Sequence, residues 1–490
     1  MTPIKPISKQ VVAIILIVLA AITLSVFSFT TSPLYKEPCA WDSAIFQIIG
    51  KAWSEGVVPY AGLWDLKGPI IFFINAIGYA LTGSRTGVFL LQWVSLSATL
   101  IILCRLVCNC HRDLLCPTVI FSLFSFGANI LGGNTVEEYL LPLLALSYAL
   151  IYRWLEQAER SPEHPPRWAV AYGLVLGFSL LTRLSNGLGI CMAVAIIAVW
   201  IARHGRWRNL LHNVAAFAAG FAAVVLPFLL YFWAKDATAD MWYGTIFYNL
   251  DYAGTVSPDI KSYVEVAKSM VYYADTWLLL ATSILMLLLK SRRRMAVVMW
   301  MGVAMINLLW LLRGYQFSHY AITSLPLVAI SLMELTDLCH EKADGRTFHR
   351  ASAIIVVYAI VISGALIHAI QLTKNYHYDD RLTTFRSMIN GLPQGYKQSF
   401  AAYNCPANWY LYEDIRPKVR FFAFQDFEAE QSLTYRRYLQ EDFRRLPEWV
   451  LVNEKAREID GILRQNYHVW KTDKAAGLTL YRANNPSIEE

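Results

Sequence analysis

The sequence predicts a polytopic α-helical membrane protein that carries a small α/β domain at its C-terminal end. The first observation is composition: 56% of the 490 residues are hydrophobic and only 16% are charged, which departs from ordinary globular domains in both respects. The second is a series of apolar stretches near the roughly 20 residues that a helix needs to cross a bilayer. The third is a change at about residue 372, after which charged residues run throughout the chain.

Eleven apolar segments are predicted to span the membrane. Their approximate bounds are 11–30, 86–108, 114–131, 139–155, 168–182, 187–202, 210–233, 276–289, 295–312, 320–336 and 351–370. The first segment has no small-residue cleavage site after it, so we expect it to remain as an anchor. The apolar stretch 70–83 is short for a crossing helix and fits one that lies in the membrane interface.

The distribution of basic residues predicts which loops are cytoplasmic. With residues 70–83 not crossing, the loops on the N-terminal side hold 17 Lys and Arg residues, and the opposite loops hold nine. Because cytoplasmic loops carry the basic excess, we predict a cytoplasmic N-terminus and an extracytoplasmic C-terminus in the plasma membrane. Membrane topology also accounts for the net charge of +7, so no nucleic-acid partner is expected.

Two domains are therefore expected. Residues 1–371 form the membrane domain, with a first outer loop over 31–85, and residues 372–490 form the extracytoplasmic α/β domain. Within the second domain the alternation of residue types predicts strands at FFAF, WVLVN, HVWK and LTLYR. It predicts helices at QSLTYRRYLQEDFRRL and EKAREIDGILRQNY.

The stretch Trp41–Pro69 is polar, aromatic and glycine-rich, and it gathers three charged residues that are candidates for chemistry. Asp42 is a candidate general base for an acceptor hydroxyl, or it caps a helix that begins at Ser43. Lys67 is a candidate phosphate ligand, because the Gly-Pro pair after it stiffens the backbone. Asp65 is a candidate for binding the acceptor or a metal; alternatively, it forms an exposed ion pair of small energy with Lys67.

Further charged residues fall at the ends of later segments on the same predicted outer face. Glu137 and Glu138 are acceptor or metal candidates, because adjacent carboxylates suit a divalent cation; acids also favour helix N-termini. Arg183 and Arg313 either neutralise a phosphate or anchor the helix ends in the interface. His319 either donates to the same phosphate or hydrogen-bonds a neighbour. Charged groups at span ends tend to face a water-filled cavity or a partner, so we predict one outer cavity that they share.

These motifs resemble a known family. An Asp in the first outer loop is followed by PYAGLWDLKGP and an apolar helix, and later come an EEY turn, RLSNG, and HY before a Pro-containing segment. In this order and on one side, they resemble the bacterial membrane glycosyltransferases of the GT-C superfamily. The nearest group comprises the protein O-mannosyltransferase-like enzymes and the lipid A aminoarabinose transferase.

The resemblance implies a GT-C-like fold and an inverting transfer from a polyprenyl-phosphate sugar donor on the outer face. By position, Asp42 matches the catalytic acid of the family's first outer loop, and Lys67 matches the lysine of its KPP-type element. This chain has KGP in place of KPP, and Ser43 follows Asp42 where the protein mannosyltransferases have Glu. The acceptor is thus left open between an envelope glycan, a lipid and a protein.

Two other readings compete with a transferase. One is a non-enzymatic flippase or exporter of lipid-linked glycans, which should place ionisable residues near the bilayer midplane and not at one face. The other treats residues 372–490 as a binding module on a membrane scaffold. The transferase is expected to work among membrane lipids, with a divalent cation as an open cofactor.

Overall fold

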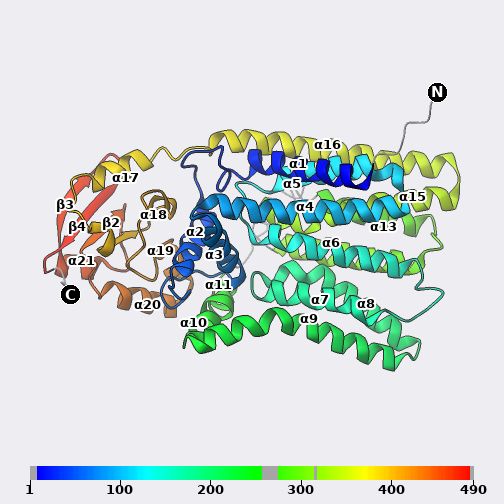
Figure 1. Cartoon of the computed structure of the whole chain (residues 1–490), viewed down its shortest axis with the longest axis horizontal. Helices are drawn as coiled ribbons and strands as arrows, with labels where there is room; N and C mark the ends of the chain where they lie inside the picture. Colours follow the sequence, from blue (N-terminus) through cyan, green and yellow to red (C-terminus); the bar gives the residue numbers. More distant parts are fainter. Residues whose placement is uncertain (1–7, 256–273, 314–316, 486–490) are drawn as a thin grey trace. The chain divides into compact units, whose positions relative to one another are not determined.

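The computed structural model describes residues 8–255, 274–313 and 317–485 of the chain (Figure 1), and it divides into two compact units. We call them the helical unit and the mixed unit. The helical unit comprises Met1–Leu34, Phe89–Pro227 and Pro258–Lys374, and the mixed unit comprises Tyr35–Val88, Phe228–Ser257 and Asn375–Glu490. By contact, therefore, most of the first outer loop belongs with the C-terminal segment, whereas the sequence-based division assigned it to the membrane domain.

Helices make up the helical unit, where they run side by side (Figure 1). They are α1 (Lys9–Phe27), α4 (Arg85–Cys110), η1 (Arg112–Leu114), α5 (Leu115–Asn129), α6 (Val136–Leu155), α7 (Pro166–Leu180), η2 (Leu184–Gly187), α8 (Leu188–Arg203), α9 (Trp207–Ala234), α13 (Ala274–Leu288), α14 (Arg294–Arg313), η5 (Ser318–Ser324), α15 (Pro326–Lys342) and α16 (Gly345–Asn375). Ten of the eleven predicted segments each match one of these helices, and the segment 320–336 is divided between η5 and α15.

The chain is a multi-pass membrane protein. Among the described residues, six helices are long and apolar enough to cross a membrane, or seven if the bent pair Ser318–Ser324 and Pro326–Lys342 forms one span. The count of eleven spans and the orientation of the termini stay predictions. Residues 70–83 do form a short helix, α3 (Pro69–Thr82), of 14 residues, and its place in the membrane interface stays a prediction.

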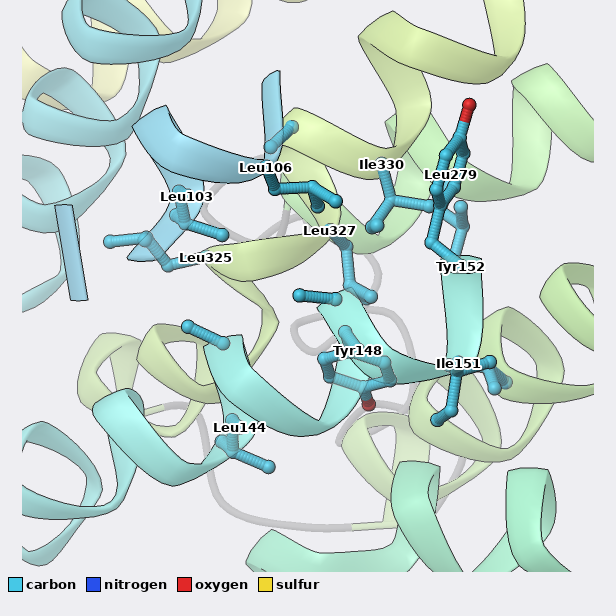
Figure 2. Close-up of a cluster of buried hydrophobic side chains, with 14 of the residues drawn as sticks. Leu103, Leu106, Leu144, Tyr148, Ile151, Tyr152, Leu279, Leu325, Leu327 and Ile330 are labelled. Atoms are coloured by element: carbon cyan, nitrogen blue, oxygen red, sulfur yellow. The ribbon is translucent and has the colours of Figure 1, made fainter. Parts of the chain in front are cut away.

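The core of the helical unit is a cluster of branched aliphatic and aromatic side chains (Figure 2). Its labelled members come from α4, α6, α13, the residue between η5 and α15, and α15; they are Leu103, Leu106, Leu144, Tyr148, Ile151, Tyr152, Leu279, Leu325, Leu327 and Ile330. All of these side chains are buried. Their apolar surface, packed between helices far apart in sequence, fixes where the polar ends of α6, η2 and η5 lie.

In the mixed unit, α2 (Trp41–Ser54) and α3 (Pro69–Thr82) pack closely against each other. A Cβ atom added at Gly50 would lie 2.4 Å from the Cβ of Asn75 and 2.8 Å from the backbone nitrogen of Ala76. Only glycine allows this approach. The two helices thereby hold the ends of the loop that carries the candidate charges.

A four-stranded sheet forms the C-terminal part of the mixed unit, in the order β1-β2-β4-β3. Its strands are β1 (Phe400–Tyr403), β2 (Trp449–Asn453), β3 (Tyr467–Asp473) and β4 (Leu478–Ala483); β1 pairs with β2 in parallel, and the other pairs are antiparallel. The remaining helices are α10 (Thr238–Trp242), η3 (Tyr243–Phe247), α11 (Tyr248–Thr255), α17 (Leu382–Ile389), η6 (Tyr396–Ser399), α18 (Asn408–Tyr412), α19 (Gln425–Gln431), α20 (Leu433–Phe443) and α21 (Asp460–Asn466).

The predicted α/β character of this part is confirmed, with one correction. Three predicted strands correspond to β2, β3 and β4, but the strand predicted at FFAF (residues 421–424) is wrong. Phe424 has a φ angle of 51°, which ends any extended run there and opens α19 instead. The strand that pairs with β2 is FAAY, at Phe400–Tyr403.

Candidate functional site

Asp42 and Lys67 form an ion pair in the mixed unit, and with Asp65 they make up what we call the loop site. Lys67 Nζ lies 4.0 Å from Asp42 Oδ2. The Asp42 side chain is 53% exposed and that of Lys67 is 25% exposed. A carboxylate this open is accessible to a substrate, and an ammonium lies beside it.

Asp42 is not the cap of its helix, so the alternative of a helix beginning at Ser43 is wrong. Helix α2 begins at Trp41 with Ala40 at the N-cap, and Asp42 lies in the first turn. There the helix dipole favours its negative charge. Trp41 holds a positive φ of 36°, and its ring meets that of Tyr376 edge-on at 4.7 Å. A strained residue next to a candidate base agrees with a site whose geometry is held by its surroundings.

Asp65 is buried, which overturns the alternative of an exposed Asp65–Lys67 ion pair. Its side chain is 9% exposed, and Oδ2 accepts a hydrogen bond of 3.0 Å from the backbone N–H of Lys67. Burial raises the pKa of Asp65 to about 6, although the charge of Lys67 lowers it. The carboxyl of Asp65 therefore shapes the turn before Lys67.

The backbone around Lys67 is held from both sides. The hydroxyl of Tyr60 donates to the carbonyl of Lys67 at 2.7 Å, and the side-chain amide of Asn249 donates to the carbonyl of Leu66 at 2.9 Å. Helix α3 then begins directly at Pro69, with its φ preset for the first helical position. These contacts fix the position from which the Lys67 side chain extends.

Two further residues reach this region that the sequence analysis did not select, Tyr248 and Glu428. The Tyr248 hydroxyl donates a hydrogen bond to the buried carboxylate of Glu428. Burial raises the pKa of Glu428 to about 7; Tyr248 lowers it, and the charge of Asp65 raises it further. Both residues lie far from the loop in sequence, and no local motif marks either of them.

A second group of charged residues lies in the helical unit, and we call Glu137, Arg183, Asn186, His319 and Tyr320 the arginine cluster. Glu137 is 1% exposed, and its Oε1 lies 3.6 Å from Arg183 Nη1 and accepts a hydrogen bond of 3.2 Å from Asn186. The Arg183 guanidinium lies 3.2 Å from the ring centre of Tyr320. Arg183 is thus a partly buried, paired cation, and the alternative that it anchors a helix end in the interface stays a prediction.

The structure brings His319 to this cluster and leaves Arg313 untested. The ring of His319 meets that of Tyr320 edge-on at 4.6 Å and stacks on Phe317 at 5.6 Å. Arg313 is the last residue of α14, and its side chain lies outside the described residues. The phosphate roles of Lys67, Arg183 and His319 stay predictions.

Glu137 and Glu138 have different partners. Glu138 Oε1 accepts from the backbone N–H of Thr135 at 2.7 Å, as the third helical residue of a capping box, and Oε2 accepts from Gln92 at 2.7 Å. Glu138 therefore caps the helix, and Glu137 also lies in its first turn, where acids are favoured. In the described part of the chain, no group of three or more His, Cys, Asp or Glu side chains could hold a metal ion, and the divalent cation stays a prediction.

The fold defines the class of this protein: it is a membrane protein with the fold of the GT-C glycosyltransferases. The structure is similar to the crystal structure of ArnT from Cupriavidus metallidurans bound to undecaprenyl phosphate, with a TM-score of 0.55, 13% identity and 98% of both chains covered. At this identity the likeness shows the fold alone, and it confirms the predicted resemblance at that level.

The sequence family is narrower than this fold class. The family model named Putative competence-induced protein Ccs4 N-terminal domain matches residues 5–370, and the chain belongs to this family. No curated protein matches the sequence.

Proposed function

We propose that this protein is a membrane glycosyltransferase that moves a sugar from a polyprenyl-phosphate donor to an acceptor on the outer face of the membrane. The observation that carries the proposal is the Asp42–Lys67 pair: an accessible carboxylate beside an ammonium, in the first loop of a GT-C fold. The acceptor is an envelope glycan, a lipid or a protein.

In this reaction Asp42 is the base. The acceptor hydroxyl attacks the anomeric carbon of the sugar, its proton passes to the Asp42 carboxylate, and the bond between the anomeric carbon and the phosphate oxygen breaks. The electron pair of that bond leaves with the polyprenyl phosphate, and attack from the opposite side inverts the configuration. General-base catalysis of this kind contributes about 10²–10⁴-fold to the rate.

The leaving phosphate is a dianion, so placed cations matter more for it than proton donation. Lys67 supplies one such cation. The phosphate role predicted for Arg183 is supported within the helical unit by its buried Nη1, which donates no hydrogen bond within the described residues. His319 adds a ring nitrogen beside Tyr320.

The test is transfer from radiolabelled polyprenyl-phosphate sugars by the purified protein in detergent. We expect Asp42→Asn to lower the rate of donor consumption by about 10²–10⁴-fold without a loss of thermal stability. The matched control is Glu55→Gln, an exposed acid just after the same helix that pairs with Lys51. Transfer by Asp42→Asn at the wild-type rate would exclude Asp42 as the base. Movement of the donor across vesicles without its consumption would favour an exporter.

A further inference from the structure

Trp64, one residue before Asp65, is inserted into a set of aromatic rings that we call the tryptophan socket. The socket consists of Tyr243, Tyr248, Phe421 and Tyr435. The ring centre of Trp64 lies 5.0 Å from those of Tyr248 and Tyr435, both edge-on, and the side chain is 5% exposed. Such pairs stabilise each other beyond the area they bury. The loop site is thus attached to α11 and to the C-terminal segment.

The backbone of the loop is also attached to these two parts of the chain. The N–H of Trp64 donates to the carbonyl of Arg420 at 2.9 Å. Next to Tyr248, the π-helical turn η3 places Gly244 against the loop, where an added Cβ would lie 2.7 Å from the Tyr60 ring and 3.0 Å from the Asp65 carbonyl. Any side chain at position 244 would displace the loop, so this close contact requires glycine.

Glu428 is the buried charge behind the socket. It is 5% exposed, and the hydroxyl of Tyr248 donates to its carboxylate. A buried carboxylate is costly unless it is hydrogen-bonded, and a hydrogen bond to the charged form is about twice as strong as a neutral one. The Glu428 carboxyl accepts the hydrogen bond of Tyr248, and Tyr248 in turn packs against Trp64.

We propose that Glu428 is a positioning residue of the loop site: through Tyr248 and Trp64, it holds the turn from which Asp65 and Lys67 extend. The effect of Glu428 on catalysis rests on the proposed transferase function, but its effect on the position of the loop does not. In this proposal the C-terminal segment completes the site, and it is more than a separate binding module.

The charges around Glu428 make the contact sensitive to pH. The groups that act on it are Tyr248 on α11, Asp65 and Lys67 in the loop and Asp42 on α2, and its own charge acts on Tyr435 on α20. Burial raises the pKa of Glu428 to about 7. Because the closed socket binds this proton more tightly than a solvated Glu428 would, the neutral carboxyl favours the closed socket, and the socket should loosen as the pH rises through about 7.

The structural test is amide hydrogen exchange of the peptide that covers residues 60–67 in the full-length protein. In Glu428→Ala and in Tyr248→Phe, we expect the amides of Trp64 and Lys67 to exchange about tenfold faster or more, since the hydrogen bond between these two side chains is lost. The matched control is Glu430→Ala, at an exposed acid of the same helix that pairs with Arg457 at 2.8 Å. Exchange in both variants as slow as in the control would overturn the proposal.

The catalytic test is the pH profile of transfer. Wild-type activity should decline as the pH rises through about 7, because the ionised Glu428 loosens the socket, and Glu428→Gln, which cannot ionise, should lose this limb. A lower kcat with an unmoved limb, or faster exchange with unchanged kcat, KM and limb, would overturn the positioning role. If the wild-type protein consumes no donor, the proposed function fails, and hydrogen exchange alone then decides whether Glu428 holds the loop.

Discussion

The loop site and the arginine cluster hold their charges in opposite ways. In the loop site, Asp42 is half-exposed and lies 4.0 Å from Lys67. In the arginine cluster, Glu137 is buried, paired with Arg183 and hydrogen-bonded by Asn186. An open carboxylate can exchange protons with a substrate, whereas a buried pair offers a fixed field. The two groups therefore differ in how their charges can act, and variants of each should respond differently.

The largest expected effect is on stability: a variant of the arginine cluster should lose much more unfolding free energy than a variant of the loop site. Arg183→Ala leaves the Glu137 carboxylate buried without its cation, which should lower the free energy of unfolding by about 3–5 kcal/mol. Lys67→Ala removes a partner from an exposed acid and should cost about 1 kcal/mol or less. Thermal unfolding in detergent measures both.

A double variant gives the control for Arg183. Adding Glu137→Gln to Arg183→Ala removes the unpaired charge and keeps the carbonyl that Asn186 binds, so most of the lost stability should return. Equal stability losses for Arg183→Ala and Lys67→Ala would contradict the distinction between a buried and an open pair.

The next effect concerns Asp65 and is smaller. Its folded pKa of about 6 lies above the ordinary value of 3.8, so the folded state binds the proton more tightly than the unfolded state. This carboxyl therefore favours folding at low pH, and the contribution is lost as the pH rises through about 6. Asp65→Asn should raise the stability by up to about 2–3 kcal/mol at pH 8, with no gain at pH 4.

The measurement is the unfolding temperature of wild type and Asp65→Asn between pH 4 and pH 8. The asparagine oxygen can still accept from the Lys67 N–H, so the turn is retained. A difference that does not vary with pH would show that the charge of Asp65 is not the cause.

Local patterns in the sequence predicted much of the fold. Apolar length predicted the helices, and alternation predicted WVLVN, HVWK and LTLYR as strands, because both patterns are set by neighbouring residues. FFAF and FAAY are equally apolar, and only pairing with β2 decides between them. The positive φ of Phe424 ends the extended run, and no local pattern in the sequence marks it.

The candidate site was predicted residue by residue but not in its contacts. Charge and position in the chain selected Asp42, Lys67, Glu137 and Arg183, and the structure pairs the first two and the last two. Glu428 was not predicted because its role depends on the hydrogen bond from Tyr248, which lies 180 residues away in sequence. The single outer cavity predicted for all of these residues stays a prediction.

The smallest expected effect concerns Glu137 and Glu138, the adjacent acids of α6, which should differ in how their variants change stability and transfer. Glu138 accepts from Thr135 and Gln92 through its two oxygens, so Glu138→Gln keeps one of these hydrogen bonds in neutral form and loses the other, because an amide nitrogen cannot accept; this should cost about 1–2 kcal/mol in unfolding free energy. Donor consumption should stay within about twofold of wild type, because a capping residue does not contact the substrate. Glu137→Gln, in contrast, frees Arg183 and should change the KM for the donor. A loss of transfer in Glu138→Gln at unchanged stability, matched by a loss on chelation of divalent cations, would instead make Glu138 a metal ligand.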